Sequence, residues 1–234
     1  MNPEYIALGL LWYIAFLFSL TCHEAAHALV AQWGGDLTAA RGGQVTLNPL
    51  PHIRREVFGT TIMPILSYAL GGWMIGWGSA PYDPHWRYRH PHRAAWMAMA
   101  GPAANLVLVV AAGLAIRAGI SAGALAPPLS VHFTRVVAAV RPGPLEGVAI
   151  LLSITFSLNL LLAVFNLLPI PPLDGHGAIC ILFTEDFARR FTQSTSNSSL
   201  ALLGLIVGWK VFGYIYSPLF ATALKVLYAG TGHR

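Results

Sequence analysis

Two histidines and a glutamate in one apolar stretch have the types and spacing that best fit chemistry: His23, Glu24 and His27. Residues four apart project from the same face of a helix, about 5–6 Å apart at Cβ, so both imidazoles can bind one metal ion. A His-Glu-x-x-His pattern on a helix is typical of zinc sites in which the glutamate acts as a base. A glutamate near the centre of a membrane helix costs about 2.5–3.5 kcal/mol, which favours a use for this group.

A catalytic zinc ion needs a third protein ligand and one open position, and Asp174 is the best candidate for that ligand. It follows a proline-rich run, Asn166-Leu-Leu-Pro-Ile-Pro-Pro-Leu173, and precedes Gly175. Prolines end a helix there, so a turn can present the carboxylate at membrane depth, surrounded by protein or a water-filled cavity. The alternatives are an ordinary turn aspartate, and a structural polar cluster or structural zinc for the histidines.

The composition predicts the kind of elements that must position these residues. Of 234 residues, 56% are hydrophobic and only 10% are charged, against about 25% charged in a soluble domain. We therefore expect an all-α polytopic protein of the lipid bilayer, organised as a single domain over residues 1–234. The net charge of +5 comes without a basic run interleaved with aromatics, so no nucleic-acid partner is expected.

Hydropathy divides the chain into apolar segments at 5–33, 57–78, 94–117, 147–170 and 200–228. A small β-hairpin is predicted at 37–47, where short β-prone runs flank Arg41-Gly-Gly43. His27 and Asp174 lie toward the C-terminal ends of their segments. To bind the same metal ion they must lie at the same depth in the membrane, so the first and fourth segments must run parallel. Segment 57–78 is therefore predicted not to make a simple crossing, because Pro64 and Gly71-Gly72 can break it into a re-entrant or in-plane element.

The positive charges predict an orientation in the membrane. With segment 57–78 not crossing, the side of the candidate metal site holds Arg41, Arg54, Arg55, Arg87, Arg89, Arg93, Arg189 and Arg190. The opposite side holds Arg117, Arg135, Arg141, Lys225 and Arg234. This bias places the metal site toward the cytosol.

Three motifs resemble those of the site-2 protease family of intramembrane zinc metalloproteases: HEAAH at 23–27, Gly101-Pro-Ala-Ala-Asn105, and the run from Asn166 to Gly175. The similarity extends to Gly35-Asp-Leu-Thr-Ala39, Val45-Thr-Leu-Asn-Pro49 and Phe58-Gly-Thr60, and covers residues 18–180. It is closest to the compact branch without PDZ or CBS domains. Ser79 is a departure, because related chains often have a lysine there.

The resemblance implies that His23, His27 and Asp174 bind one Zn²⁺ and that Glu24 is the catalytic acid and base. It implies cleavage of membrane-anchored proteins in or near their transmembrane segments, and the compact form suggests a prokaryotic cell membrane. Alternatives are a catalytically silent scaffold, a zinc transporter, and a metalloprotease class completed by Glu146 or Glu185. The third and fifth segments lack the acids that a transport path needs. Nothing in the sequence sets the oligomeric state.

For several other polar residues and segments, the sequence leaves more than one role open. Asn105 and Asn166 are candidates for oxyanion stabilisation or substrate positioning, with helix–helix hydrogen bonding and bracing of the proline turn as the respective alternatives. His176 is expected to contact the site indirectly or lie at the surface, since three ligands suffice. The His- and Arg-rich residues 84–93 are expected to face solvent or headgroups. Segments 37–47 and 78–84 could pair with an extended substrate, or simply connect helices.

Overall fold

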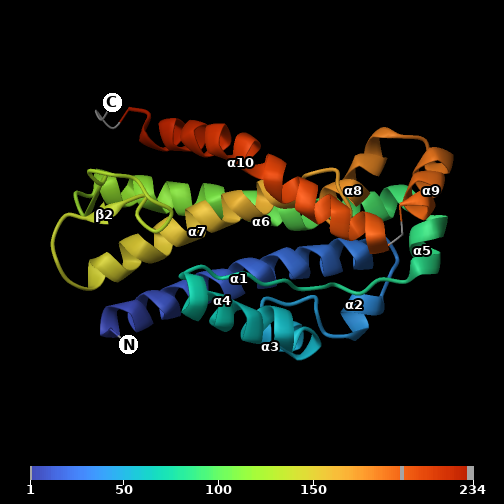
Figure 1. Ribbon diagram of the computed structural model, residues 1–234, viewed down its shortest axis with the longest axis horizontal. Helices are drawn as coiled ribbons and strands as arrows, with labels where there is room; N and C mark the ends of the chain where they lie inside the picture. The colour runs from blue at the N-terminus through green and yellow to red at the C-terminus, as the bar shows by residue number, and fades with distance from the viewer. Residues whose placement is uncertain (1, 196–197, 231–234) are drawn as a thin grey trace.

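Four long helices lie side by side in the computed structural model, which describes residues 2–195 and 198–230. They are α1 (Pro3–Trp33), α6 (Pro91–Ser121), α7 (Pro144–Asn166) and α10 (Ser198–Tyr228). Within the described residues, 3–33, 91–121, 144–166 and 203–228 are long and apolar enough to cross a membrane. Helices α1 and α7 run in one direction, and α6 and α10 in the other (Figure 1). The prediction that the first and fourth segments are parallel is confirmed, as is the all-α polytopic class.

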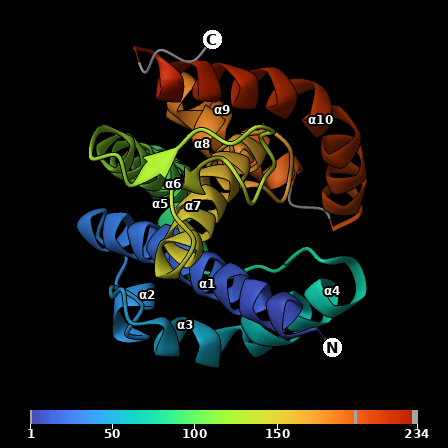
Figure 2. The same cartoon turned by 90° about the vertical axis from the view of Figure 1, so that its left-hand side faces the viewer.

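Short elements connect the long helices, mostly at the end where α1 stops. These are α2 (Thr38–Arg41), α3 (Pro49–Arg55), the π-helical η1 (Phe58–Ile62), α4 (Met63–Gly71), α5 (Pro84–Arg89), α8 (Asp174–Ala178), the 3₁₀ helix η2 (Ile179–Leu182) and α9 (Glu185–Ser194). The end-on view places α1, α6 and α7 at the centre, with α3 and α4 beyond α1 and α10 on the far side (Figure 2).

The β-hairpin predicted at 37–47 is wrong in its location. Asp36 Oδ1 accepts hydrogen bonds from Thr38 N (2.9 Å) and Thr38 Oγ1 (2.6 Å), and the chain then forms the short helix α2. This local side-chain bonding starts a turn instead of a strand, and two alanines favour the helix that follows. The small antiparallel sheet lies instead between α6 and α7, where β1 (Leu125–Ala126) pairs with β2 (Ala138–Ala139).

Segment 57–78 forms no spanning helix and turns back on itself, as the predicted re-entrant or in-plane element would. Its helical part, 58–71, is shorter than the spanning helices, and Gly72 ends it in the left-handed conformation (φ 73°). The chain then returns extended beside the same helical stretch, with Trp77 N donating to Gly59 O over 3.1 Å. We call residues 73–83 the return strand. It ends where Asp83 N donates to Asp36 Oδ2 (2.8 Å), just beyond the end of α1.

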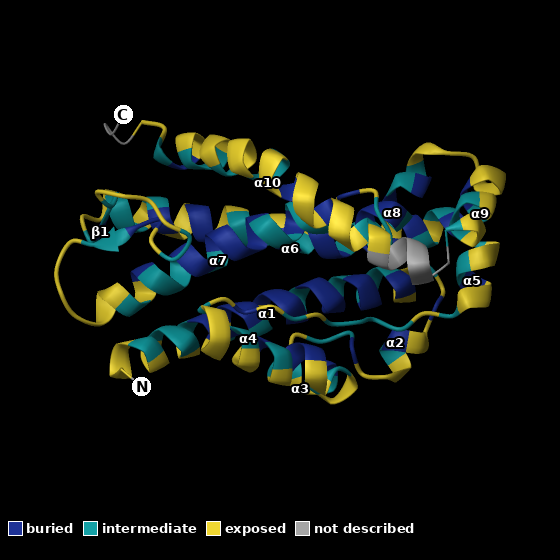
Figure 3. Ribbon diagram, viewed as in Figure 1, coloured by how far each residue is buried: buried dark blue, intermediate teal, exposed yellow. Residues whose placement is uncertain are grey.

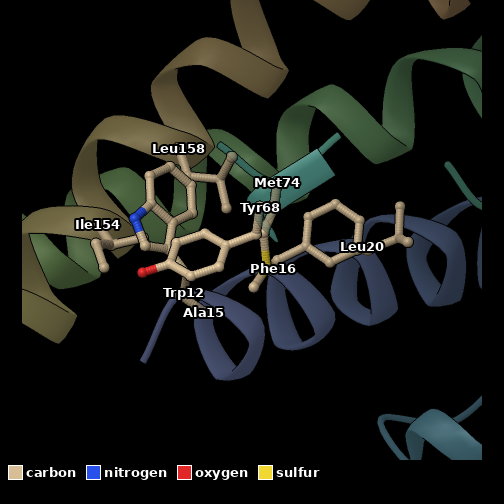
Figure 4. Close-up of a cluster of buried hydrophobic side chains, with 8 residues drawn as sticks. All are labelled: Trp12, Ala15, Phe16, Leu20, Tyr68, Met74, Ile154 and Leu158. Atoms are coloured by element: carbon tan, nitrogen blue, oxygen red, sulfur yellow. The ribbon is translucent and has the colours of Figure 1, made fainter. Parts of the chain in front are cut away.

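One of the apolar clusters joins the re-entrant segment to the spanning helices. Figure 4 shows Trp12, Ala15, Phe16 and Leu20 of α1 with Tyr68, Met74, Ile154 and Leu158. Burial is concentrated where the central helices face one another (Figure 3). By contrast, only 11% of the most apolar window of α10 is buried. Its exposed apolar side chains suit a lipid-facing surface. Arg234, which the sequence predicts on the side opposite the metal site, lies outside the described residues.

Candidate metal centre

Three side chains that can bind a metal converge between α1 and α8. His23 and His27 project from one face of α1, and Asp174 begins α8. Asp174 Oδ2 lies 3.1 Å from His23 Nε2, Asp174 Oδ1 lies 3.4 Å from His27 Nε2, and the two Nε2 atoms are 3.0 Å apart. Within the described residues these three form the only group of three or more metal-ligating side chains whose ligand atoms converge.

When the two rings are neutral, the hydrogen bonds of their Nδ1 atoms leave both Nε2 atoms as acceptors. His27 Nδ1 lies 2.7 Å from Met97 O, and a backbone carbonyl only accepts, so Nδ1 carries the hydrogen. His23 Nδ1 donates to Asn105 Oδ1 over 2.6 Å. Two lone pairs therefore face each other at 3.0 Å beside a carboxylate, an arrangement that repels itself unless a cation lies between them.

The spacing of these atoms fits zinc. Ligand atoms placed 2.0–2.1 Å from a tetrahedral zinc ion lie about 3.3 Å from one another. The two Nε2 atoms are 3.0 Å apart, and each lies 3.1 to 3.4 Å from one oxygen of Asp174, Oδ2 for His23 and Oδ1 for His27. Asp174 Oδ2 is buried and has no hydrogen-bond donor, which is the state expected of a metal ligand. The three residues present therefore fit a zinc ion.

Gly101 of α6 makes room for this centre. A Cβ built at Gly101 would lie 2.5 Å from His23 Nε2 and closer still to His27 Nε2. Only glycine leaves the space between the α6 backbone and the imidazoles open.

The turn after α7 presents Asp174 to the histidines. Helix α7 ends at Asn166, and Leu173 is extended (φ −69°, ψ 156°) just before α8. Leu173 N donates to Ile170 O over 2.9 Å, which closes the proline-rich turn. Gly175 lies directly against the carbonyl of Leu167, where a Cβ would clash.

Glu24 lies between α1 and the return strand. It is buried, and a Cβ built at Gly78 would lie 2.8 Å from Glu24 Cγ and 2.9 Å from Glu24 Oε1. The strand therefore passes within contact distance of this carboxylate. Gly78 begins the predicted candidate segment 78–84, but its contact with Glu24 was not predicted, although a glycine is a signal that the backbone approaches something closely.

The two asparagines occupy different surroundings. Asn105 is fully buried; its Oδ1 accepts from His23 and its Nδ2 donates to Asn159 Oδ1 (2.8 Å). Both ends of its amide are engaged, which favours the hydrogen-bonding alternative over direct contact with a substrate. Asn166 is the half-buried last residue of α7, and its side chain has no hydrogen bond within the described residues.

His176 points away from the ligand set. Its ring stacks on Phe191, with ring centroids 4.8 Å apart, and its Nε2 is buried without a partner among the described residues. Burial, and after it the charge of Arg87, lower the pKa of His176. The imidazole thus remains neutral at physiological pH, as part of the packing under α9.

The His- and Arg-rich residues 84–93 form α5 and the first turn of α6. Arg93 donates to Gly34 O (3.1 Å) and Arg189 donates to Tyr88 O (3.1 Å). The first bond ties the end of α1 to α6 and the second ties α9 to α5, so the two arginines brace an otherwise exposed end of the bundle.

Comparison with known proteins agrees with this geometry. Residues 11–209 match Peptidase family M50. The chain is 32% identical to "Putative zinc metalloprotease YwhC" of Bacillus subtilis over 87% of this chain and 84% of that protein. It is similar to two mycobacterial proteins of the same description named Rip2: 32% identical in Mycolicibacterium smegmatis (75% of this chain, 58% of that protein) and 30% in Mycobacterium tuberculosis (86% and 70%).

No solved structure matches the chain. The family match covers most of the sequence and includes the motifs on α1 and α6 and at the end of α7. The chain therefore belongs to peptidase family M50, the site-2 protease family of zinc metalloproteases.

Proposed function

We propose that this protein is an intramembrane metalloendopeptidase with one zinc ion, which hydrolyses peptide bonds in or near transmembrane segments of membrane-anchored proteins. The observation that carries the proposal is the convergence of His23, His27 and Asp174 beside Glu24, on and around a helix apolar enough to span a membrane. Residues 1–234 would act as a single domain.

The residues divide the chemistry among them. A zinc ion at this site would activate water and polarise the scissile carbonyl. Glu24 follows His23 directly, and it takes the proton of the attacking water and passes it to the leaving amine. The buried setting strengthens each electrostatic interaction, because little water remains to screen it.

The return strand is the candidate platform for the substrate. A peptide bond within a helix is shielded by its own hydrogen bonds, so the substrate must unwind into an extended strand. Trp77 N is bonded to Gly59 O, whereas the backbone groups of Gly76 and Gly78 have no hydrogen-bond partner within the described residues. A substrate strand can pair with this free edge beside Glu24. Residues 37–47 no longer qualify, since they contain a helix and a turn.

Asn166 is our candidate for stabilising the oxyanion, because its amide lies eight residues before Asp174 and has no hydrogen-bond partner among the described residues. Asn166→Ala should slow cleavage while leaving the zinc content intact. Loss of zinc in this variant would instead assign Asn166 to the structure of the proline turn.

We also propose an orientation in a prokaryotic cell membrane with the metal centre toward the cytosol. The end of the bundle that holds α2, α5 and α9 contains Arg41, Arg87, Arg89 and Arg189, and positive charge favours the cytosolic side. The relatives described above are bacterial.

Purified wild type and Glu24→Gln, compared in detergent, test the proposal. We expect zinc in both proteins, cleavage of a model transmembrane substrate by the wild type, and no cleavage by the variant. Glutamine keeps the shape of the side chain but cannot accept the proton. Zinc in both without cleavage by the wild type would favour a silent scaffold, and absence of zinc from both would refute the metal centre.

A further inference from the structure

A chain of buried polar side chains leads away from the metal centre into the bundle. His23 donates to Asn105, Asn105 Nδ2 donates to Asn159 Oδ1 (2.8 Å), and Asn159 Nδ2 donates to Ser19 Oγ (2.8 Å). Asn105, Asn159 and Ser19 are each 0% exposed. This series of hydrogen-bonded side chains passes from α1 to α6 to α7 and returns to α1 one helical turn before His23. It therefore links the three central helices at the depth of the metal.

One contact of Asn159 determines which group donates and which accepts in every hydrogen bond of this buried series. Asn159 Nδ2 lies 2.8 Å from the backbone carbonyl of Thr155, which can only accept, so this end of the amide must be the nitrogen. Ser19 agrees, since its hydroxyl donates to Ala15 O (2.7 Å) and its oxygen is left to accept from Asn159. Both hydrogens of the Asn159 amide are thus used, and its oxygen must face Asn105.

The orientation of the Asn159 amide sets that of Asn105 and, through Asn105, the tautomer of His23. Because Asn159 presents an oxygen, Asn105 must turn its nitrogen toward it and its oxygen toward His23. An oxygen facing Nδ1 requires a hydrogen of His23 on Nδ1, and in the neutral ring this leaves the Nε2 lone pair free for the metal. His27 reaches the same state through the backbone carbonyl of Met97, so only His23 depends on side chains for its tautomer.

We propose that Asn159, anchored by the Thr155 carbonyl and Ser19, is a positioning residue that holds His23 in its metal-binding tautomer. The inference rests on the proposed zinc site, but it assigns a role to a residue that never touches the metal or the substrate. Partners that orient a metal-binding histidine typically change metal affinity about 10–100-fold when removed. A role in helix packing alone would change stability without changing the tautomer.

The test compares Asn159→Leu with Ser157→Ala in the full-length protein in detergent. Leucine has the same number of side-chain heavy atoms as asparagine and the same branch at Cγ, but it is bulkier and cannot orient Asn105. Ser157 is a matched control, because it is equally buried, lies on the same helix, and its hydroxyl has no hydrogen-bond partner among the described residues. Zinc affinity is measured by chelator competition. The tautomer is read from the ¹⁵N shifts of the histidine rings in the metal-free protein.

For Asn159→Leu we expect zinc affinity to fall by about 10–100-fold and His23 to show both tautomers, with His27 unchanged. Ser157→Ala should match the wild type in both measurements. Ser19→Ala serves if Asn159→Leu does not fold; it should show a smaller loss of affinity in the same direction, because the Thr155 carbonyl still anchors Asn159.

The outcomes separate this inference from the proposed function. If the wild type binds zinc and Asn159→Leu keeps both its affinity and the Nδ1 hydrogen of His23, the positioning role is refuted while the protease proposal stands. An equal loss of affinity in Ser157→Ala would also overturn it, as a general packing effect. A wild type that binds no zinc would refute the proposed function, and this inference with it.

Discussion

His23 and His27 obtain the same tautomer from chemically different partners. The partner of His27 is the carbonyl of Met97, which no side-chain substitution removes. The partner of His23 is an amide whose orientation depends on further side chains. Zinc affinity should therefore be less sensitive to substitutions around His27 than to substitutions of Asn105, Asn159 or Ser19, which lie behind His23.

Gly101 offers a sharp test of the metal centre at the residue scale. Gly101→Ala places a methyl group 2.5 Å from His23 Nε2 and nearer to His27 Nε2, in the space the metal needs. We expect loss of bound zinc and of cleavage in a protein that still folds, measured by metal analysis after purification.

Gly113→Ala is the matched control on the same helix. A Cβ there would make only ordinary contacts, at 3.6 Å from Leu227 Cδ1 and Phe156 Cε2, and alanine should stabilise the helix by up to about 1 kcal/mol. Full zinc content in Gly101→Ala would show that the ligands do not lie against α6 as described.

At the scale of elements, two glycines fix the return strand beside Glu24. A Cβ at Gly76 would clash with the carbonyl oxygen of Gly59 and lie 2.6 Å from Phe16 Cζ. The strand is therefore pressed against η1 and α1 at the point just before Gly78 contacts Glu24. Its position depends on the close packing of the Gly76 backbone against the Gly59 carbonyl and the Phe16 ring.

Gly76→Ala should displace the return strand without touching the metal ligands. We expect cleavage to fall sharply while zinc content remains, since His23, His27 and Asp174 lie on other elements. Gly71→Ala, at a helical position with open space around it, should leave both properties unchanged. Zinc loss in Gly76→Ala would mean that the strand supports the metal centre itself.

Asp36 joins the end of α1 to the end of the return strand, and its contribution should depend on pH. Burial raises its pKa, but hydrogen bonds from the Thr38 hydroxyl and from the amides of Thr38 and Asp83 outweigh this and hold the pKa below its usual range. A lowered pKa means that the carboxylate stabilises the fold fully above the unfolded pKa of about 3.9. This stability is lost as the pH falls through the folded pKa.

Asp36→Asn removes the charge and so tests that dependence. The variant should be less stable than the wild type at neutral pH, and the difference should shrink below pH of about 4, measured by thermal unfolding in detergent. A difference that stays constant across this range would show that the ionised carboxylate is not the source of the stability.

For the whole molecule, the re-entrant segment decides the topology. Because 58–83 enters and leaves at one end, α1 and α7 are parallel, and Asp174 after α7 reaches the depth of His27 near the end of α1. A full crossing would have placed the aspartate and the histidines at opposite ends of the bundle.

Cysteine labelling in intact cells tests this topology. In a Cys22→Ala, Cys180→Ala background, Arg41→Cys and Arg89→Cys should react from the same side of the membrane and Arg141→Cys from the opposite side. All three arginines are exposed, which makes the positions suitable. Labelling of positions 41 and 89 from opposite faces would contradict the re-entrant arrangement.

Spacing and composition were enough to predict several features of this protein before its structure. The four-residue interval between His23 and His27 sets a common helix face, and low charge sets the membrane environment. The need for His27 and Asp174 to meet required parallel helices and a re-entrant 57–78. These inferences hold because helical periodicity and the transfer of apolar surface from water are local properties of the chain.

The tertiary structure alone decided which distant residues touch. The hydrogen bond from His23 to Asn105 spans 82 positions and that from Asn159 to Ser19 spans 140, and no local pattern encodes such pairs. Gly78 against Glu24 and Gly101 against the imidazoles are likewise products of packing. The hairpin at 37–47 failed for a related reason, because Asp36 bonds both to Thr38 nearby and to Asp83 across the fold. Side-chain hydrogen bonds of this kind outweigh the weak propensities by which short segments are predicted.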